Sequence, residues 1–165
     1  MENKKITTRQ FVRIALLTAL AAVLTMFPHM PTPTGGYVHF GDSVIYIAAI
    51  FLGPVPGMIV GAFGHSIADA FTAPIFIPAT FIVKGIMGLL IGKIAYQKFD
   101  IKHFVLAGIV ALIIVVFGYF FAEWIMFGLG GALTVFVSSP IQWGMSLVAS
   151  AVLIPIFRIV YKRIN

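Results

Sequence analysis

Apolar residues fill this chain in long continuous runs, which are separated by short polar or proline- and glycine-rich breaks. The runs do not alternate apolar and polar positions as half-buried strands do, so the pattern predicts helices rather than a strand-built barrel. The predicted helical segments are Thr8–Phe27, Asp42–Leu52, Pro56–Phe71, Ala79–Tyr96, Phe104–Phe127 and Ser139–Val160. We expect an all-α membrane protein: one domain, residues 1–165, forming a compact bundle of six transmembrane helices.

Segment length separates these helices into two kinds. A helix rises 1.5 Å per residue and needs about 20 residues to cross the apolar core of a bilayer. The first, fifth and sixth segments meet that length. Asp42–Leu52 reaches only about 16 Å, so we expect this short second helix to be enclosed by the rest of the protein. Ser139 and Pro140 favour a helix start, as cap and first turn.

Composition supports a membrane location. The chain is 61% hydrophobic and 10% charged, with a mean hydropathy of +1.07. A soluble domain carries about 25% charged residues, so this chain lacks the charge to cover a surface that faces water. It has no cysteine, which excludes disulfides, thiolate metal sites and cysteine nucleophiles.

The basic residues predict the orientation. If there are six spans, all basic residues except Lys84 fall on one side, and the loops 29–41, 72–78 and 128–138 on the other side contain none. Basic loops mark the cytoplasmic side, so we expect a multi-pass protein of the cell membrane with both termini in the cytoplasm. These basic residues mark the orientation of the chain in the membrane, so we do not expect them to form a surface that binds nucleic acid. The residues concerned are Lys4, Lys5, Arg9, Arg13, Lys93, Lys98, Lys102, Arg158, Lys162 and Arg163.

Polar side chains recur near the outer ends of five different segments. Charges inside a span cost about 2.5–3.5 kcal/mol on insertion scales, which makes each one a functional candidate. Aromatic residues gather at the same level, and together they suit a small ring-bearing ligand. Three acids against one lysine favour a cation, or a neutral ring that carries amino or protonatable nitrogen. The predicted substrate-binding residues are His39, Asp42, Asp69, Lys84, Glu123, Trp124, Phe127, Gln142 and Trp143.

Simpler explanations exist for several of these residues. Tryptophan and tyrosine are enriched at membrane interfaces, Asp42 is suited to capping the second helix, and Lys84 can form a structural pair with one acid. His65 and Asp69 share a helix face, but two ligands without a third do not make a metal site. We therefore expect no metal and no cofactor.

Motifs for chemistry are missing. Lys93 follows a glycine-containing stretch but is itself followed by Ile94 rather than Ser or Thr, so no ATP-binding loop is present, and neither HExxH nor GxSxG occurs. We expect no enzyme. Two alternatives stay open: a stand-alone secondary transporter, although no internal repeat is evident, and a small intramembrane enzyme that uses His65 and Asp69.

Small residues recur at helical spacing in three segments. Glycines near residues 57–64 and 85–92 are interpreted as internal helix packing. The alanine stripe Ala15, Ala19 and Ala22 lies toward the cytoplasmic half of the first segment, where a partner helix could dock.

Four stretches together carry a family likeness: HFGDSVIY (39–46), GPVPG (53–57), GAFGHSIAD (61–69) and PATFIVKGIMG (78–88). The chain resembles the substrate-binding membrane subunit, or S component, of energy-coupling factor (ECF) vitamin transporters. That resemblance implies a six-helix bundle that binds its ligand near the outer face, under the loop between the first two spans. It implies an ABC-type importer with one membrane coupling subunit and two cytoplasmic ATPases as partners, and contact with membrane lipid.

The resemblance extends to the substrate class. The chain looks similar to members assigned to hydroxymethylpyrimidine or pyridoxine. Relatives for riboflavin, thiamine and pantothenate share the same architecture. The Ala15–Ala19 spacing resembles the motif with which such subunits meet the coupling subunit.

Overall fold

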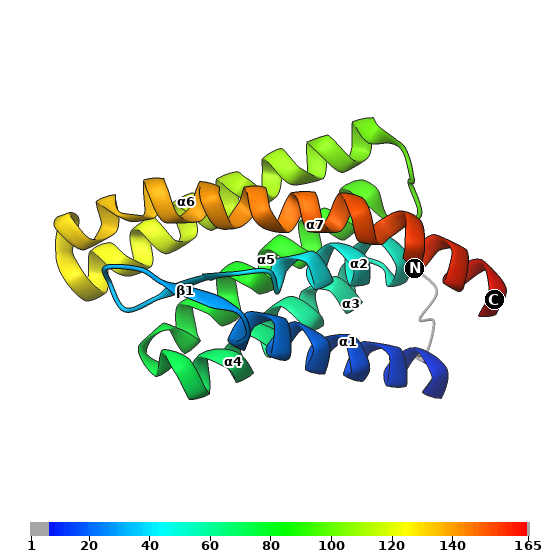
Figure 1. Ribbon diagram of the computed structural model, residues 1–165, viewed down its shortest axis with the longest axis horizontal. Helices are drawn as coiled ribbons and strands as arrows, with labels where there is room; N and C mark the ends of the chain where they lie inside the picture. Colours follow the sequence, from blue (N-terminus) through cyan, green and yellow to red (C-terminus); the bar gives the residue numbers. More distant parts are fainter. Residues whose placement is uncertain (1–6, 165) are drawn as a thin grey trace.

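The computed structural model describes residues 7–164, with side chains through residue 162. Lys4, Lys5 and the Arg163 side chain, which belong to the predicted charge bias, lie outside the described residues. The chain forms a bundle of roughly parallel helices with a small hairpin at one end (Figure 1). The elements are α1 (Thr8–Met26), β1 (His29–Pro31), β2 (Tyr37–His39), α2 (Asp42–Leu52), α3 (Pro54–Ile59), η1 (Val60–Gly64), α4 (His65–Thr72), η2 (Pro74–Phe76), α5 (Ile77–Ala95), α6 (Ile101–Leu133) and α7 (Val135–Ile164).

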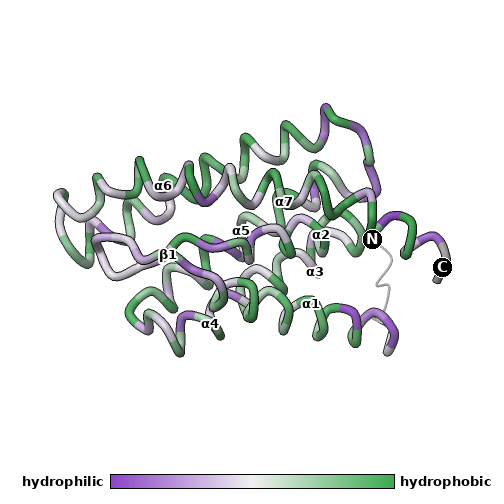
Figure 2. Tube along the Cα trace, in the orientation of Figure 1, coloured by the Kyte–Doolittle hydropathy of each residue, from purple (hydrophilic) through white to green (hydrophobic). Residues whose placement is uncertain are grey.

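The expected all-α membrane fold is confirmed. Four helices are long and apolar enough to cross a bilayer: Thr8–Met26, Pro74–Ala95, Ile101–Leu133 and Val135–Lys162. Large apolar side chains such as Phe71 and Ile125 lie exposed on the outside, where lipid can cover them. Hydrophilic residues gather at the end of the bundle that holds the start of α1, the end of α7 and the α5–α6 connection (Figure 2).

The third helical rod is continuous but not uniform. α3, the π-helical turn η1 and α4 follow one another with helical dihedral angles at Val60 and His65, so residues 54–72 form one rod of roughly 28 Å. The rod starts at Pro54, two residues before the predicted start. A π turn adds one residue to a helical turn and so changes the direction of the side chains that follow it. This turn sets the direction of His65.

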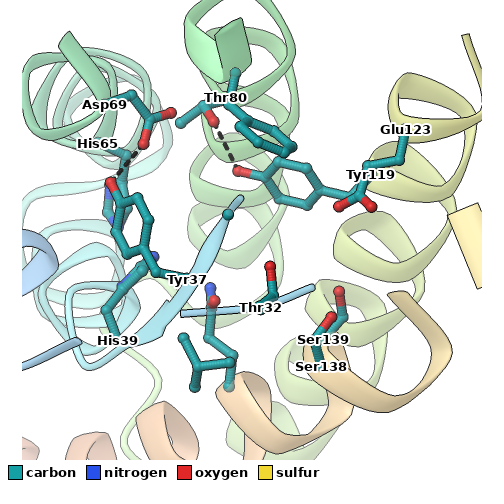
Figure 3. A pocket seen from close by; sticks show the side chains of 14 residues that line it. Thr32, Tyr37, His39, His65, Asp69, Thr80, Tyr119, Glu123, Ser138 and Ser139 are labelled. Atoms are coloured by element: carbon teal, nitrogen blue, oxygen red, sulfur yellow. Dashed lines mark hydrogen bonds between the residues drawn. The ribbon is translucent and has the colours of Figure 1, made fainter. Parts of the chain in front are cut away.

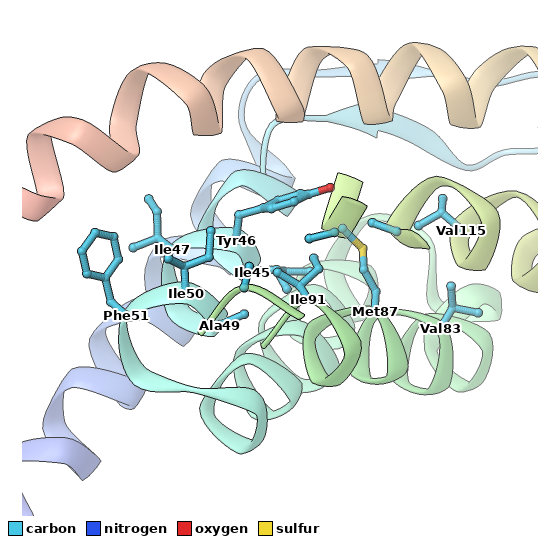
Figure 4. Packing of buried hydrophobic residues seen from close by; sticks show 13 residues of the cluster. Ile45, Tyr46, Ile47, Ala49, Ile50, Phe51, Val83, Met87, Ile91 and Val115 are labelled. Atoms are coloured by element: carbon cyan, nitrogen blue, oxygen red, sulfur yellow. The ribbon is translucent and has the colours of Figure 1, made fainter. Parts of the chain in front are cut away.

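The buried second helix was predicted correctly, with the same bounds. Every residue of α2 except Leu52 is buried, and the helix packs against α1, α3, α5 and α7. Its side chains form the centre of the apolar core with residues of α5 and α6 (Figure 4). A helix that is apolar all round is stable only when protein or lipid surrounds it, and here protein does.

The predicted loop 128–138 is wrong, because most of it is helical. α6 continues to Leu133 with one break at Gly128, where φ is +74°, and α7 begins at Val135. Ser139 therefore caps no helix; it lies inside α7, next to Pro140. The break directly follows Phe127, where the predicted fifth segment ended. A glycine stands there because a residue with a side chain rarely adopts this φ. The helix restarts because Thr134 keeps helical dihedral angles and its hydroxyl donates to the carbonyl of Gly131.

Glycines allow the third rod and α5 to touch backbone to backbone. A Cβ atom at Gly61 would lie 2.3 Å from the carbonyl oxygen of Lys84, and one at Gly88 would lie 2.1 Å from that of Gly57. The prediction that these glycines serve internal packing is confirmed. On the other side of the rod, Gly64 packs against Ala21 of α1.

The alanine stripe is only partly exposed. Ala15 and Ala19 are exposed, whereas Ala22 is buried. η1 and α4 pack against α1 and cover it near Ala22. Ala22 is thus corrected from a docking residue to an internal packing residue.

Candidate functional site

A polar cavity lies at the hairpin end of the bundle. It measures about 50 Å³, enough for a few water molecules, and its walls come from the hairpin, α4, α5, α6 and α7. Figure 3 shows the side chains around it. Its lining residues are Thr32, Gly36, Tyr37, Val38, His39, His65, Asp69, Phe76, Thr80, Tyr119, Glu123, Ser138, Ser139 and Gln142. Larger hollows, such as the one of about 290 Å³ between α1, α2 and α7, are lined almost wholly by apolar side chains.

The hairpin covers the cavity. β1 and β2 pair antiparallel, with His29 opposite His39 and Pro31 opposite Tyr37. The Tyr37 hydroxyl donates to Oδ1 of Asp69 on α4. Burial, and then the charge of Asp69, raise the pKa of Tyr37 above its usual range, so Tyr37 remains a donor. Ser146 on α7 donates to the backbone oxygen of His39 at 3.3 Å and ties the other side of the hairpin down.

A buried ion pair stands next to the cavity. The Lys84 Nζ atom lies 2.7 Å from both carboxylate oxygens of Asp42, and both side chains are at most 2% exposed. Gln142 Nε2 donates to Asp42 Oδ2 at 2.9 Å. The N-cap residue of α2 is Gly41, and Asp42 lies in the first turn. Of the explanations left open by the sequence, the mutual pair of Lys84 with an acid matches the structure and the cap does not.

Two carboxylate oxygens in the cavity wall, Asp69 Oδ2 and Glu123 Oε2, accept no well-aligned hydrogen bond, although the Thr80 hydroxyl lies near Asp69 and the Thr34 hydroxyl near Glu123. Asp69 comes from α4 and Glu123 from α6, and Figure 3 shows them on opposite sides of the cavity. Between them, Thr80 and Tyr119 join through their hydroxyls at 2.9 Å. Buried acceptors are costly when unpaired, so the cavity is suited to a solute that brings donors to both sides.

The histidines form a second group at the wall. His39 is buried, and its Nδ1 accepts from the backbone N–H of Gly41 at 3.1 Å. Burial lowers the pKa of His39 well below its usual value, although the nearby Asp42 acts in the opposite direction. The His39 and His65 rings lie with centroids 5.2 Å apart.

Some of the predicted site residues lie together and others do not. His39, Asp69, Glu123 and Gln142 line the cavity, and Asp42 and Lys84 lie directly behind it. The remaining three are the aromatic residues Trp124, Phe127 and Trp143, and none of them lines it.

The aromatic residues have structural positions instead. Trp124 is half exposed and packs against Phe120 and Phe121. It faces away from the cavity because neighbouring helix positions point about 100° apart and Glu123 faces inward. Phe127 packs behind Phe76, which does line the cavity. Trp143 donates to the backbone oxygen of Gly108 at 2.7 Å and packs against the apolar core.

Sequence reasoning missed the hydroxyl groups of the lining. Thr32, Thr80 and Ser138 were not singled out, Ser139 was considered only as a helix cap, and Tyr37 and Tyr119 counted only among the aromatic residues. Serine and threonine within helices usually bond their own backbone, so their presence alone gives little signal. The useful signal was their position at the same level as the acids.

Comparisons with known proteins agree with this architecture. Residues 5–163 match the family model described as "ECF-type riboflavin transporter, S component". A relative from Pyrococcus woesei, described as "Uncharacterized protein in gap 3'region", is 30% identical over 121 residues, covering 73% of this chain and 82% of that one. A UPF0397 protein of Streptococcus pneumoniae serotype 19F (strain G54) is 27% identical over 116 residues, covering 66% of this chain and 63% of that one.

The family model covers nearly the whole chain and includes every element that forms the cavity. S components are the substrate-binding membrane subunits of transporters and not an enzyme family. The chain belongs to the ECF-type riboflavin transporter S component family.

Proposed function

We propose that this chain is the high-affinity substrate-binding subunit of an ECF-type ABC importer, and that its substrate is a small nitrogen-containing ring such as hydroxymethylpyrimidine or pyridoxine. The main support is the pair of unpartnered acceptors, Asp69 Oδ2 and Glu123 Oε2, on two sides of one covered polar cavity. A ring with amino or hydroxyl donors at two ends satisfies both acceptors. Phe76 and Tyr119 supply apolar and aromatic surface for its faces.

The orientation and the partners belong to the same proposal. The chain crosses the membrane six times, with the hairpin end outside and both termini in the cytoplasm. The basic residues at one end support this orientation. A membrane coupling subunit and two cytoplasmic ATPases complete the importer, which accounts for a subunit without an ATP-binding loop. The exposed Ala15 and Ala19 give the coupling subunit a close approach to α1.

Riboflavin is a second candidate substrate, and the description of the matching family favours it. It is larger than a single pyrimidine or pyridine ring, so it needs a wider displacement of the hairpin from the cavity. Direct competition between the candidates decides the matter. Thiamine and pantothenate complete the panel, and the negative charge of Asp69 and Glu123 disfavours the carboxylate of pantothenate.

The test combines identification with variants. Mass spectrometry of small molecules that co-purify with the protein identifies the ligand, and calorimetry against the panel measures its affinity. Asp69→Asn and Glu123→Gln each remove one charged acceptor, worth about 1.5–3 kcal/mol, so each should weaken binding about 10- to 150-fold. Trp124→Leu, next to Glu123 but outside the cavity, is the matched control and should leave affinity unchanged.

Two results would contradict the proposal. One is a panel in which nothing binds and nothing co-purifies. The other is uptake by this chain alone, in vesicles without ATPases and driven by an ion gradient, which would favour a stand-alone secondary transporter.

A further inference from the structure

We propose that His39, Asp42 and His65 form a site for one divalent transition-metal ion, of the zinc class, in the wall of the cavity. Each of the three buried residues offers a ligand atom, and these atoms all lie within 4.8 Å of one another. From the sequence only His65 and Asp69 were weighed as a pair of ligands, and no metal was expected. In the folded chain, Asp69 bonds Tyr37, while His65 turns toward Asp42.

The His65 ring carries the first argument. Its Nδ1 lies 3.1 Å from the carbonyl oxygen of Gly61, and a carbonyl only accepts, so Nδ1 holds the proton. If the ring carries a single proton, Nε2 is a bare acceptor; it makes no aligned hydrogen bond, although Asp42 Oδ1 lies 3.1 Å away and the side chain is only 1% exposed. A histidine oriented by a backbone carbonyl on one nitrogen and free on the other has the usual arrangement of a metal ligand.

The second argument is the short distance between His65 and Asp42. Nε2 lies 3.1 Å from Asp42 Oδ1, yet the two atoms are not aligned for a hydrogen bond. Two acceptors this close repel unless a proton on Nε2 or a metal ion lies between them. Zinc–nitrogen and zinc–oxygen bonds of about 2.0–2.2 Å at the tetrahedral angle separate neighbouring ligand atoms by roughly 3.4 Å. The observed 3.1 Å is near that spacing, and it is also the length of a hydrogen bond from a protonated Nε2 to the carboxylate.

His39 supplies the third ligand. It lies on β2 and lines the cavity together with His65, on the same side in Figure 3. Its Nδ1 now accepts from the Gly41 N–H. Ligation through Nδ1 would replace that bond, and ligation through Nε2 would move the ring proton to Nδ1. Either route gives up one neutral hydrogen bond, about 1 kcal/mol, in exchange for a metal bond.

The local charge agrees with a divalent ion. When all three acids are ionised, Asp42, Asp69 and Glu123 outweigh Lys84 by two charges. One divalent ion supplies both charges. Lys84 lies 2.7 Å from both oxygens of Asp42 and Gln142 donates to Oδ2, so the ion takes Oδ1 when Lys84 withdraws to Oδ2.

The donor set defines the class of ion and its use. Two imidazoles and one carboxylate suit zinc, cobalt or nickel and disfavour magnesium or calcium, which prefer all-oxygen sites. Three protein ligands leave a fourth position, and the cavity on which both histidines lie can fill it with water or with a ring nitrogen of the solute. The site stands independently of the proposed substrate.

The experiment uses the full chain in detergent, purified without a polyhistidine tag and freed of metal with a chelator. Zn²⁺ is titrated against a chromophoric competitor, and Co²⁺ is titrated separately, because its visible absorption reports coordination number. We expect one ion per chain. His65→Ala and His39→Ala should each weaken Zn²⁺ binding at least about 100-fold. His103→Ala, at a partly exposed histidine near the start of α6, is the matched control and should bind as the wild type does.

The outcomes separate this site from the proposed function. The metal site is overturned if the wild type binds neither Zn²⁺ nor Co²⁺ above the detergent blank. It is also overturned if His65→Ala binds the ions as well as the wild type does. In either case the Lys84 ammonium alone balances the charge of Asp42. Thermal unfolding of each variant shows whether it has folded. X-ray absorption of the wild-type Zn²⁺ or Co²⁺ complex needs no variant, and a shell without two imidazoles also overturns the site. Calorimetry of the metal-free protein with the vitamin panel tests the transport proposal separately.

Discussion

Removing Lys84 tests how far the buried ion pair holds the bundle together. Lys84→Met keeps most of the side-chain volume but leaves Asp42 charged and away from water. Lys84 is fully buried, and its Nζ contacts both oxygens of Asp42 at 2.7 Å, so no solvent replaces the lost partner. Breaking such a pair from one side costs about 3–5 kcal/mol. For a chain of this size the loss corresponds to a fall in unfolding temperature of roughly 6–20 °C.

The companion variants divide that cost into its causes. Asp42→Asn with Lys84→Met removes both charges and keeps a polar group near Gln142, so most of the lost stability should return. Lys98→Met, an exposed lysine in the α5–α6 connection, should change the unfolding temperature little.

The assay is thermal unfolding in one detergent at one scan rate, because membrane proteins seldom unfold reversibly. If Lys84→Met costs less than about 1 kcal/mol, the reasoning is refuted. The reasoning is also refuted if the cost of the Asp42→Asn and Lys84→Met double variant equals the sum of the costs of Asp42→Asn alone and Lys84→Met alone, since partners in contact must show coupling.

Two further predictions concern packing. Gly61→Ala should destabilise by about 1–3 kcal/mol, because its Cβ would lie 2.3 Å from the Lys84 carbonyl oxygen. Gly144→Ala, with nothing within 4 Å, should be neutral or stabilising by about 0.5–1 kcal/mol; equal effects in thermal unfolding would mean that the close approach is not real. Ala15→Leu with Ala19→Leu should leave substrate affinity within about twofold while abolishing co-purification with the coupling subunit, since both alanines are exposed. A parallel loss of affinity would show that the stripe serves internal packing.

The candidate site was predictable in its level but not in its contacts. Each acid stood near the outer end of an apolar segment, and segment ends at one side of a membrane share a depth, so the clustering of Asp42, Asp69 and Glu123 followed from counting residues. Their partners did not follow. His65 and Asp69 share a helix face by spacing, yet they bind different groups, because the π turn and the neighbouring hairpin set their directions. Trp124 was chosen for its position beside Glu123, and one step along a helix faces it away.

The sequence by itself determined that this chain lies in a membrane as a bundle of helices, because so apolar a polypeptide can satisfy its backbone in lipid only within helices. It also determined the short second helix and the glycine faces, since both are local properties of length and side-chain size. Only the tertiary structure decided that Lys84 pairs with Asp42, that His39 and His65 meet, and that Asp69 and Glu123 keep free oxygens in one cavity. These contacts join residues far apart in the chain, and they depend on the rotation of each helix, which the packing of all its neighbours sets together.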